Sequence, residues 1–191
     1  MDIELILGID PGIARMGYGV VKVSGNRLSP VAFGCIETKA HTPVGERLQI
    51  VYDELTDIIA THRPQVMAVE ELFFNRNTTT AFSVGQARGV ALLAGVQAGL
   101  TTAEYTPMQI KLAVVGYGKA QKAQVQEMVR VLLNLSERPR PDDTADALAV
   151  AITHAHTAPT LRAVQQTKSP RPSNRLTARA DLLGSRKGAR Q

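Results

Sequence analysis

The chain has 191 residues, a length that a single domain with a buried core can account for. No apolar run approaches the ~20 residues that cross a bilayer, the acidic start at Asp2 and Glu4 is unlike a secretory leader, and a single Cys35 excludes an internal disulfide, so we expect a cytoplasmic protein. The net charge of +5 arises in the segment 158–191, which holds eight Lys or Arg and one Asp, and the rest of the chain carries −2.

The first predicted elements are three strands. Residues 3–9 form a nearly continuous apolar run, which is typical of a strand buried on both faces, and the run stops at Asp10. The β-rich runs 17–23 and 31–38 are separated by a turn-like segment at 24–27, so we predict an antiparallel meander. The first strand therefore delivers a carboxylate at its C-terminal end.

A helix and a second strand that ends in an acid come next. Apolar residues recur over 48–59 with the spacing of one helix face, and Arg63-Pro64 ends that helix. The short apolar run 66–69 is a predicted strand that leads directly into Glu70. The chain thus places a second carboxylate at the end of a buried strand.

The remaining elements are helices and one more strand. We predict a helix over 77–99, a strand over 101–105, a helix that begins at Pro107, a helix over 119–133, and a last helix from near Asp142 to about His156. The order predicts an α/β fold in which a mixed five-stranded sheet, with three antiparallel strands followed by parallel strands, is flanked by helices.

The C-terminal segment differs from the rest in composition. Residues 158–191 are rich in Pro, Ser, Thr, Gln and Arg and have no sustained periodicity, so we predict a basic, disordered tail after a folded domain over 1–157. Such a tail either adds attraction for phosphates or only keeps the protein in solution. An interaction with nucleic acid cannot be argued from this segment alone.

Four carboxylates stand out by position. Asp10 and Glu70 follow strands, whereas Asp143 and Asp146 are three residues apart on the last helix and share one of its faces. If the two strands are parallel neighbours, their carboxyl ends converge where ligands of α/β proteins bind. A cluster of four acids repels itself unless cations are bound, and oxygen ligands suit Mg²⁺ or Mn²⁺.

The acidic cluster predicts a chemistry. Two metal ions ~4 Å apart could hold a phosphodiester, generate hydroxide from water and stabilise the leaving 3′ oxygen. Each acid also has a structural explanation, since Asp is common in turns such as that at Asp10 and acids favour the first turn of a helix. Capping does not explain acids at two strand ends together with a pair on one helix, whereas Asp142 and Glu71 are assigned to capping or solvent.

Several motifs, in order along the chain, resemble the RuvC family of Holliday junction resolvases. They are Gly8-Ile9-Asp10-Pro11-Gly12, Gly17-Tyr18-Gly19, Ala68-Val69-Glu70, Phe73-Phe74 with Asn77, Gly85-Gln86-Ala87-Arg88-Gly89, and Asp143-Thr144-Ala145-Asp146-Ala147-Leu148-Ala149. The resemblance covers residues from about 3 to 156 and implies an RNase H-like fold. It also implies a metal-dependent endonuclease that cuts Holliday junctions symmetrically in DNA recombination and repair.

The resemblance assigns the catalytic, metal-binding role to four acids, Asp10, Glu70, Asp143 and Asp146. Some members of the family carry His at the position of Asp143, and either residue type can bind a metal or a water. The resemblance implies Mg²⁺ as the cofactor, with Mn²⁺ as a substitute and two ions per active site.

The resemblance also implies contacts with DNA. An aromatic residue after the second acid stacks on an unpaired base, which points to Phe73 or to its neighbour Phe74, and such stacking is worth about 1 to 3 kcal/mol. Lys111 and Lys122 correspond to basic positions near the phosphates, and Lys119 and Arg76 are further candidates for phosphate contacts; the alternative for each of these basic residues is a side chain that only faces water.

A four-way junction has approximate two-fold symmetry, so a homodimer with one active site per subunit suits paired cutting. The helix around Phe82 and Gly89 is a candidate dimer seam, although its residues could equally pack on the sheet. The resemblance implies cooperation with RuvA and RuvB. Two other functions remain open: a junction-binding protein without nuclease activity, and an actin-like ATP-binding enzyme, although such enzymes duplicate this fold and we find no internal repeat.

Overall fold

The computed structural model describes the backbone of residues 3–71 and 78–168 and the side chains of residues 3–71 and 81–158. Contacts divide the chain into a unit over Met1–Pro159 and a second over Thr160–Gln191. The elements in order are β1 (Ile3–Asp10), β2 (Arg15–Ser24), β3 (Arg27–Glu37), α1 (Val44–His62), β4 (Val66–Glu70), α2 (Thr78–Gln97), β5 (Thr101–Tyr105), α3 (Pro107–Val115), α4 (Lys122–Leu132) and α5 (Asp142–Lys168).

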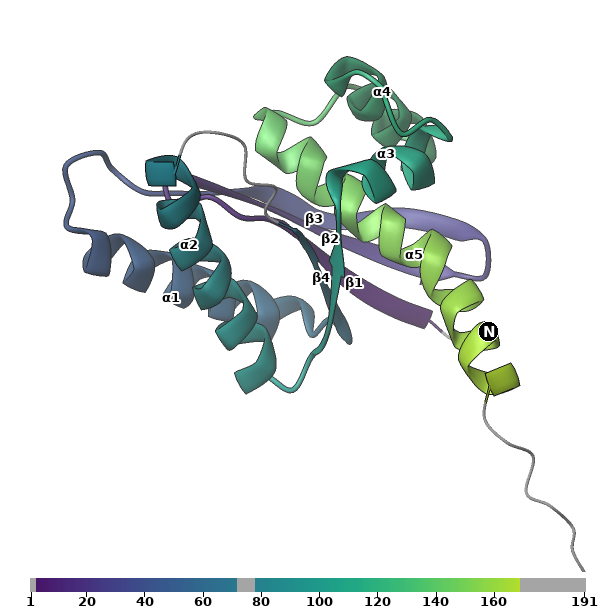
Figure 1. The fold of residues 1–191 in the computed structure, drawn as a ribbon, viewed down its shortest axis with the longest axis horizontal. Helices are drawn as coiled ribbons and strands as arrows, with labels where there is room; N and C mark the ends of the chain where they lie inside the picture. Colours follow the sequence, from purple (N-terminus) through teal and green to yellow (C-terminus); the bar gives the residue numbers. More distant parts are fainter. Residues whose placement is uncertain (1–2, 72–77, 169–191) are drawn as a thin grey trace, which may run out of the picture. The chain divides into compact units, whose positions relative to one another are not determined.

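The five strands form one sheet in the order β3-β2-β1-β4-β5 (Figure 1). The pairs β1–β2 and β2–β3 are antiparallel, and the turn between β2 and β3 contains Gly25 at a φ of 60°, a left-handed conformation that favours glycine. The pairs β1–β4 and β4–β5 are parallel. The predicted mixed five-stranded sheet is therefore confirmed.

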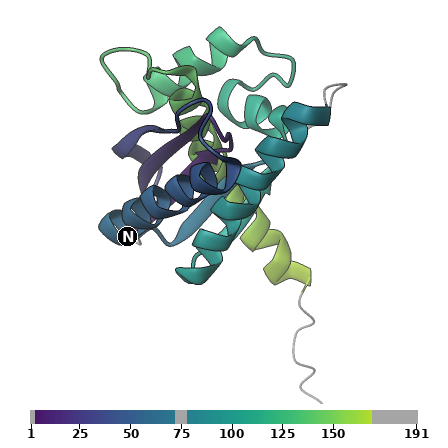
Figure 2. The ribbon, with the colours of Figure 1, turned by 90° about the vertical axis from the view of Figure 1, so that its left-hand side faces the viewer.

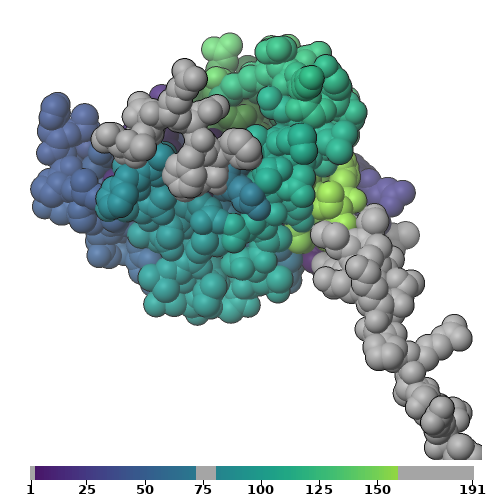
Figure 3. Space-filling view, in the orientation of Figure 1, coloured from purple at the N-terminus to yellow at the C-terminus, as the bar shows by residue number. Residues whose placement is uncertain are grey.

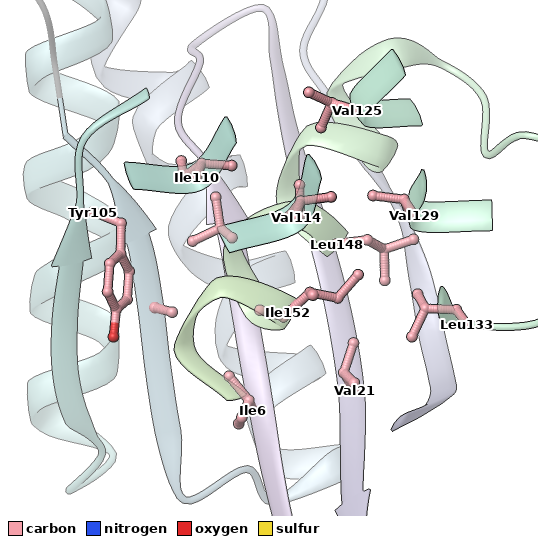
Figure 4. Packing of buried hydrophobic residues seen from close by; sticks show 14 of the residues in the cluster. Ile6, Val21, Tyr105, Ile110, Val114, Val125, Val129, Leu133, Leu148 and Ile152 are labelled. Carbon is pink, nitrogen blue, oxygen red and sulfur yellow. The ribbon is translucent and has the colours of Figure 1, made fainter. Parts of the chain in front are cut away.

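Helices cover both faces of the sheet. Helices α1 and α2 lie on one face, and α3, α4 and α5 lie on the other (Figures 1 and 2). Each face has its own apolar core: Leu7 and Ile9 of β1 pack with α1 and α2, whereas Ile6 packs with α3, α4 and α5 (Figure 4). Because side chains alternate along a strand, Gly8 and Asp10 face α5.

The middle of α5 is buried on every side. All residues from 147 to 152 have zero exposure, because the sheet lies against one face of the helix and α3 and α4 cover the others. A helix that is apolar all round is typical of such a position. Within the described residues, no helix is long and apolar enough to span a bilayer.

The last helix extends further than its sequence pattern predicts. It ends at Lys168 instead of near His156, so residues 158–168 are helical and not part of a disordered tail. The segment holds Leu161, Arg162 and Ala163, which have high helix propensity and outweigh the single Pro159. The predicted disorder of the rest of the tail concerns residues 169–191, which lie outside the described residues.

Candidate active site

Two of the predicted acids end neighbouring strands. β1 and β4 run parallel with Ile9 paired to Val69, so Asp10 and Glu70 follow at the same edge of the sheet. Ala68 packs in the core that contains α5, and by strand alternation Glu70 faces that helix as Asp10 does. The expected convergence of the strand ends on one face is therefore present.

The N-terminal part of α5 lies directly on β1 and β2. A Cβ atom at Gly17 would be 2.0 Å from the carbonyl oxygen of Asp143, and one at Gly8 would be 2.1 Å from that of Ala147. These distances leave no room for any side chain, so the two glycines allow the helix backbone to contact the strands. The close contact brings the face of α5 that carries Asp143 and Asp146 to Asp10.

The electrostatics show that the four acids form one group. Burial, followed by the charges of Glu70, Asp146 and Asp143, raises the pKa of Asp10 to about 8. Burial and the charge of Asp146 raise the pKa of Glu70 to about 7, and burial also raises the pKa of Asp146. Asp10, Glu70 and Asp146 therefore resist ionisation when no cation is bound.

Lys122 supplies a positive charge within this group. Its Nζ lies 2.8 Å from the Asp146 carboxylate and 3.6 Å from that of Asp142. Burial opposes the charged form of Lys122, but the hydrogen bond with Asp146 and the surrounding carboxylates raise its pKa. The same ammonium lowers the pKa of Asp10 and of Glu70, so it partly compensates for the mutual repulsion of the acids.

A hollow of about 210 Å³ opens beside these acids, and we call it the acidic hollow. Its polar lining is Glu70, Asp146, Lys111 and Lys122, and its apolar lining is Pro107, Ile110, Val125 and Ala149. Two of the expected phosphate contacts, Lys111 and Lys122, thus lie at the acids. Lys119 is exposed in the segment before α4 and is not among the residues that line this hollow.

Three other predicted DNA contacts cannot be placed. Phe73, Phe74 and Arg76 all lie outside the described residues, so their roles stay predictions. They follow Glu70 closely in sequence, and β4 ends at Glu70 beside the acidic hollow.

The donor set matches a divalent cation in kind and charge. Hard cations such as Mg²⁺ prefer carboxylate oxygens, and a bound cation would remove the repulsion that raises the pKa of Asp10 and Glu70. Within the described ranges, no three Asp, Glu, His or Cys side chains already stand at metal-binding positions. The acids are therefore gathered but not closed around a single point.

Sequence reasoning did not identify two features of the site. Gly8 and Gly17 appeared only as parts of family motifs, although a strand that alternates glycine with large apolar residues opposite an alanine-rich helix could have indicated a close contact. Arg15 was not a candidate either, yet its Nη1 lies 3.7 Å from the Asp143 carboxylate. No local pattern indicates that pairing, because it joins β2 to α5.

Comparisons with known proteins agree with this architecture. The model of the family described as "Crossover junction endodeoxyribonuclease RuvC" matches residues 6–154. A protein of that name from Desulfitobacterium hafniense is 64% identical over 152 residues, which are 80% of this chain and 92% of the relative. A relative of the same name from Heliobacterium modesticaldum is also 64% identical, over 80% of this chain and 94% of its own.

Solved structures give the same result. The structure of T. thermophilus RuvC in complex with a Holliday junction substrate has a TM-score of 0.79 and 40% identity, and the match covers 82% of this chain and 96% of that chain. The yeast mitochondrial Holliday junction resolvase, at 12% identity and a TM-score of 0.60, shares the fold, which is the expected RNase H-like fold. The chain belongs to the RuvC family of crossover junction endodeoxyribonucleases.

Proposed function

We propose that this protein resolves Holliday junctions by metal-dependent hydrolysis of one phosphodiester in each of two opposing strands. The observation that carries this proposal is the convergence of Asp10, Glu70 and the acidic face of α5 at one edge of the sheet. The names of relatives that are 64% identical over four fifths of the chain support the same activity.

The acids and the lysines of the site have different proposed roles. Asp10, Glu70, Asp143 and Asp146 would hold the divalent cations, Mg²⁺ or Mn²⁺ and two per site, which when bound supply Lewis acids for a water and a phosphate oxygen. Lys111 and Lys122, which line the acidic hollow with Glu70 and Asp146, would bind phosphate oxygens of the same strand. Ile110 and Val125 form part of the apolar wall of this hollow.

Recognition of the junction is assigned to the segment after Glu70. We propose that Phe73 stacks on an unpaired base at the junction centre, with Phe74 as the alternative, and that Arg76 and Lys119 add phosphate contacts. Stacking tolerates any base, so it suits recognition of junction structure in preference to sequence.

Replacement of Phe73 by Ala is expected to preserve junction binding and to slow cutting of the junction. Normal cutting by this variant would reject the role of Phe73 in catalysis.

We propose that the protein acts as a cytoplasmic homodimer together with RuvA and RuvB. The described face of α2 presents apolar side chains to solvent, since Phe82 is 71% exposed, Leu93 52% and Val96 62%. These positions and Gly89 are separated by 7, 4 and 3 residues, so they share one helix face. An exposed apolar stripe of this kind is typical of a protein contact.

The nuclease function is tested with a synthetic four-way junction in Mg²⁺ or EDTA. We expect paired nicks from the wild type with Mg²⁺, and retained junction binding without cutting from Asp10→Asn. The matched control is Asp57→Asn, because Asp57 is exposed on α1, on the opposite face of the sheet. Tight binding by the wild type without Mg²⁺-dependent nicks would favour a junction-binding protein, and equal cutting by both variants would remove Asp10 from the mechanism.

A further inference from the structure

A second hollow, of about 500 Å³, lies where the start of β2 meets the segment between α4 and α5. Four cationic side chains line it, which are Arg15, Lys122, Arg138 and Arg140, and the acids in its lining are Asp142 and Asp143. We call it the basic hollow. Its other lining residues are Gln126, Pro139 and Pro141.

The cations of the basic hollow are not fully neutralised by the acids around them. Lys122 pairs with Asp146 and Asp142, and Arg138 pairs with Glu127 at 2.7 Å. Arg15 is held loosely, at 3.7 Å from Asp143, and its side chain is 53% exposed. Arg140 is exposed and makes no ion pair with any residue that the structure describes. The hollow therefore has positive charge available for an anion.

The two hollows are neighbours. Lys122 lines both of them, and Asp143, a wall of the basic hollow, raises the pKa of Asp10 through its charge. A DNA strand carries one phosphate for roughly every 3.4 Å of helix axis. A strand with one phosphate at the acids consequently has further phosphates within reach of the basic hollow.

We propose that the basic hollow binds a backbone phosphate of the DNA strand that is cut, close to the scissile phosphate, with Arg140 as the principal contact and Arg15 beside it. This inference rests on the proposed function. Guanidinium groups match phosphate oxygens in a bidentate manner, and exposed side chains with loose or no partners form such contacts at little desolvation cost. Phosphate contacts position a strand without reading its sequence. The basic hollow therefore sets the register of the strand at the acids.

The first test measures the affinity of the full chain for a four-way junction in EDTA, where no cutting occurs, at several salt concentrations. Arg140→Ala is expected to weaken binding about three- to tenfold and to reduce the slope of log Kd against log salt by about 0.9, the value for one lost phosphate contact. Arg140→Lys keeps the charge and is expected to restore most of the slope. The matched control is Arg27→Ala, since Arg27 is exposed at the β2–β3 turn, where Ser24 pairs with Ile3 at the opposite end of β1 from Asp10.

The second test identifies the anion. The position of the cut is mapped first, and junctions are then made with an uncharged methylphosphonate at single positions on either side of it. One of these substitutions is expected to weaken wild-type binding as much as Arg140→Ala does, and to have no further effect on that variant.

The two proposals fail in different ways. Equal Kd values and equal salt slopes for Arg140→Ala and Arg27→Ala would overturn the role of the basic hollow, whatever the wild type does to the junction. Absence of Mg²⁺-dependent cutting by a wild type that binds the junction would overturn the nuclease function alone. Additive losses from the methylphosphonate and Arg140→Ala at every position would also overturn the phosphate contact, because the two groups would then act independently.

Discussion

At the scale of single residues, the folded protein keeps a carboxyl group under conditions that oppose its charge. Burial of Asp10 at the end of its strand, followed by the charges of Glu70, Asp146 and Asp143, raises its pKa to about 8. The ionised form is thus less favourable in the folded protein than in the unfolded chain, where the pKa is close to 3.8. The positive charge of Lys122 lowers the pKa of Asp10 and so reduces this cost without removing it.

The direction of the pKa shift predicts how stability depends on pH. Well below pH 3.8, Asp10 is protonated in both the folded and the unfolded state and does not change the free energy of unfolding. As pH rises from 3.8 toward 8, the unfolded chain ionises Asp10 and the folded protein does not, so the metal-free protein loses stability. We expect a loss on the order of 1 to 3 kcal/mol between pH 5.5 and 8.5 after allowance for screening. Glu70, whose pKa is raised to about 7, acts in the same direction.

The measurement is the free energy of unfolding in EDTA at pH 5.5 and at pH 8.5, for the wild type and for Asp10→Asn. The Asn side chain has no proton to lose as pH rises, so the stability of the variant is expected to fall less than that of the wild type. Addition of Mg²⁺ should restore stability to the wild type at pH 8.5 and less so to the variant. An identical pH dependence for the two proteins would show that folding does not raise the pKa of the Asp10 carboxyl.

At the scale of elements, the site depends on the contact between α5 and the strands. A Cβ at Gly17 or Gly8 would meet backbone oxygens, and backbone atoms cannot rotate away as a side chain can. Gly17→Ala is therefore expected to displace the start of α5 from β2. Because Asp143 is part of the same contact, the displacement moves an acid as well as a helix.

The expected cost of Gly17→Ala is about 1 to 3 kcal/mol of stability, the usual range for overpacking, or a fall in Tm of roughly 2 to 12 °C. Cutting of the junction in Mg²⁺ should fall by more than the loss of folded protein explains. Gly45→Ala is the matched control, since Gly45 lies in α1, no atom is within 4 Å of the place that an added methyl group would take, and alanine favours a helix. A Gly17→Ala protein as stable and active as Gly45→Ala would refute the close-contact role.

The elements also show what sequence reasoning can achieve. The strand ends at Asp10 and Glu70 can be predicted from the sequence, because they follow from the length of apolar runs, which is a local property. The order of helices and strands along the chain predicts a mixed sheet. The close approach at Gly8 and Gly17 and the pairing of Arg15 with Asp143 depend on which surfaces meet, and no single segment encodes that. The helix α5 extends beyond its predicted end near His156, because the prediction followed the polar composition and the lack of periodicity after residue 157, whereas helix propensity continues through residues 161–163.

At the scale of the whole molecule, simultaneous cutting of two strands of a four-way junction takes two active sites, whereas residues 3–71 and 78–168 hold one such group of acids, at one edge of the sheet. The space-filling view shows one face of the molecule, on which residues of α2 are prominent (Figure 3). The apolar stripe of α2, formed by Phe82, Gly89, Leu93 and Val96, offers a surface on which a second copy could pack. A two-fold axis at this stripe would pair the same residues from each copy.

The dimer is tested by the introduction of a charge into the stripe. Leu93→Glu is expected to weaken self-association at least ~30-fold, since a buried unpaired charge at an interface centre costs about 2 kcal/mol or more, and light scattering after gel filtration should report a monomer. Val131→Glu is the control, because Val131 is an apolar residue on α4 whose exposure, 52%, equals that of Leu93.

The same variants are compared in their cutting of DNA. On a supercoiled plasmid that extrudes a cruciform, paired cuts give linear DNA and a single cut gives a nicked circle. The control should therefore produce linear DNA and Leu93→Glu nicked circles, and linear DNA from a monomeric Leu93→Glu protein would mean that one subunit makes both cuts in turn.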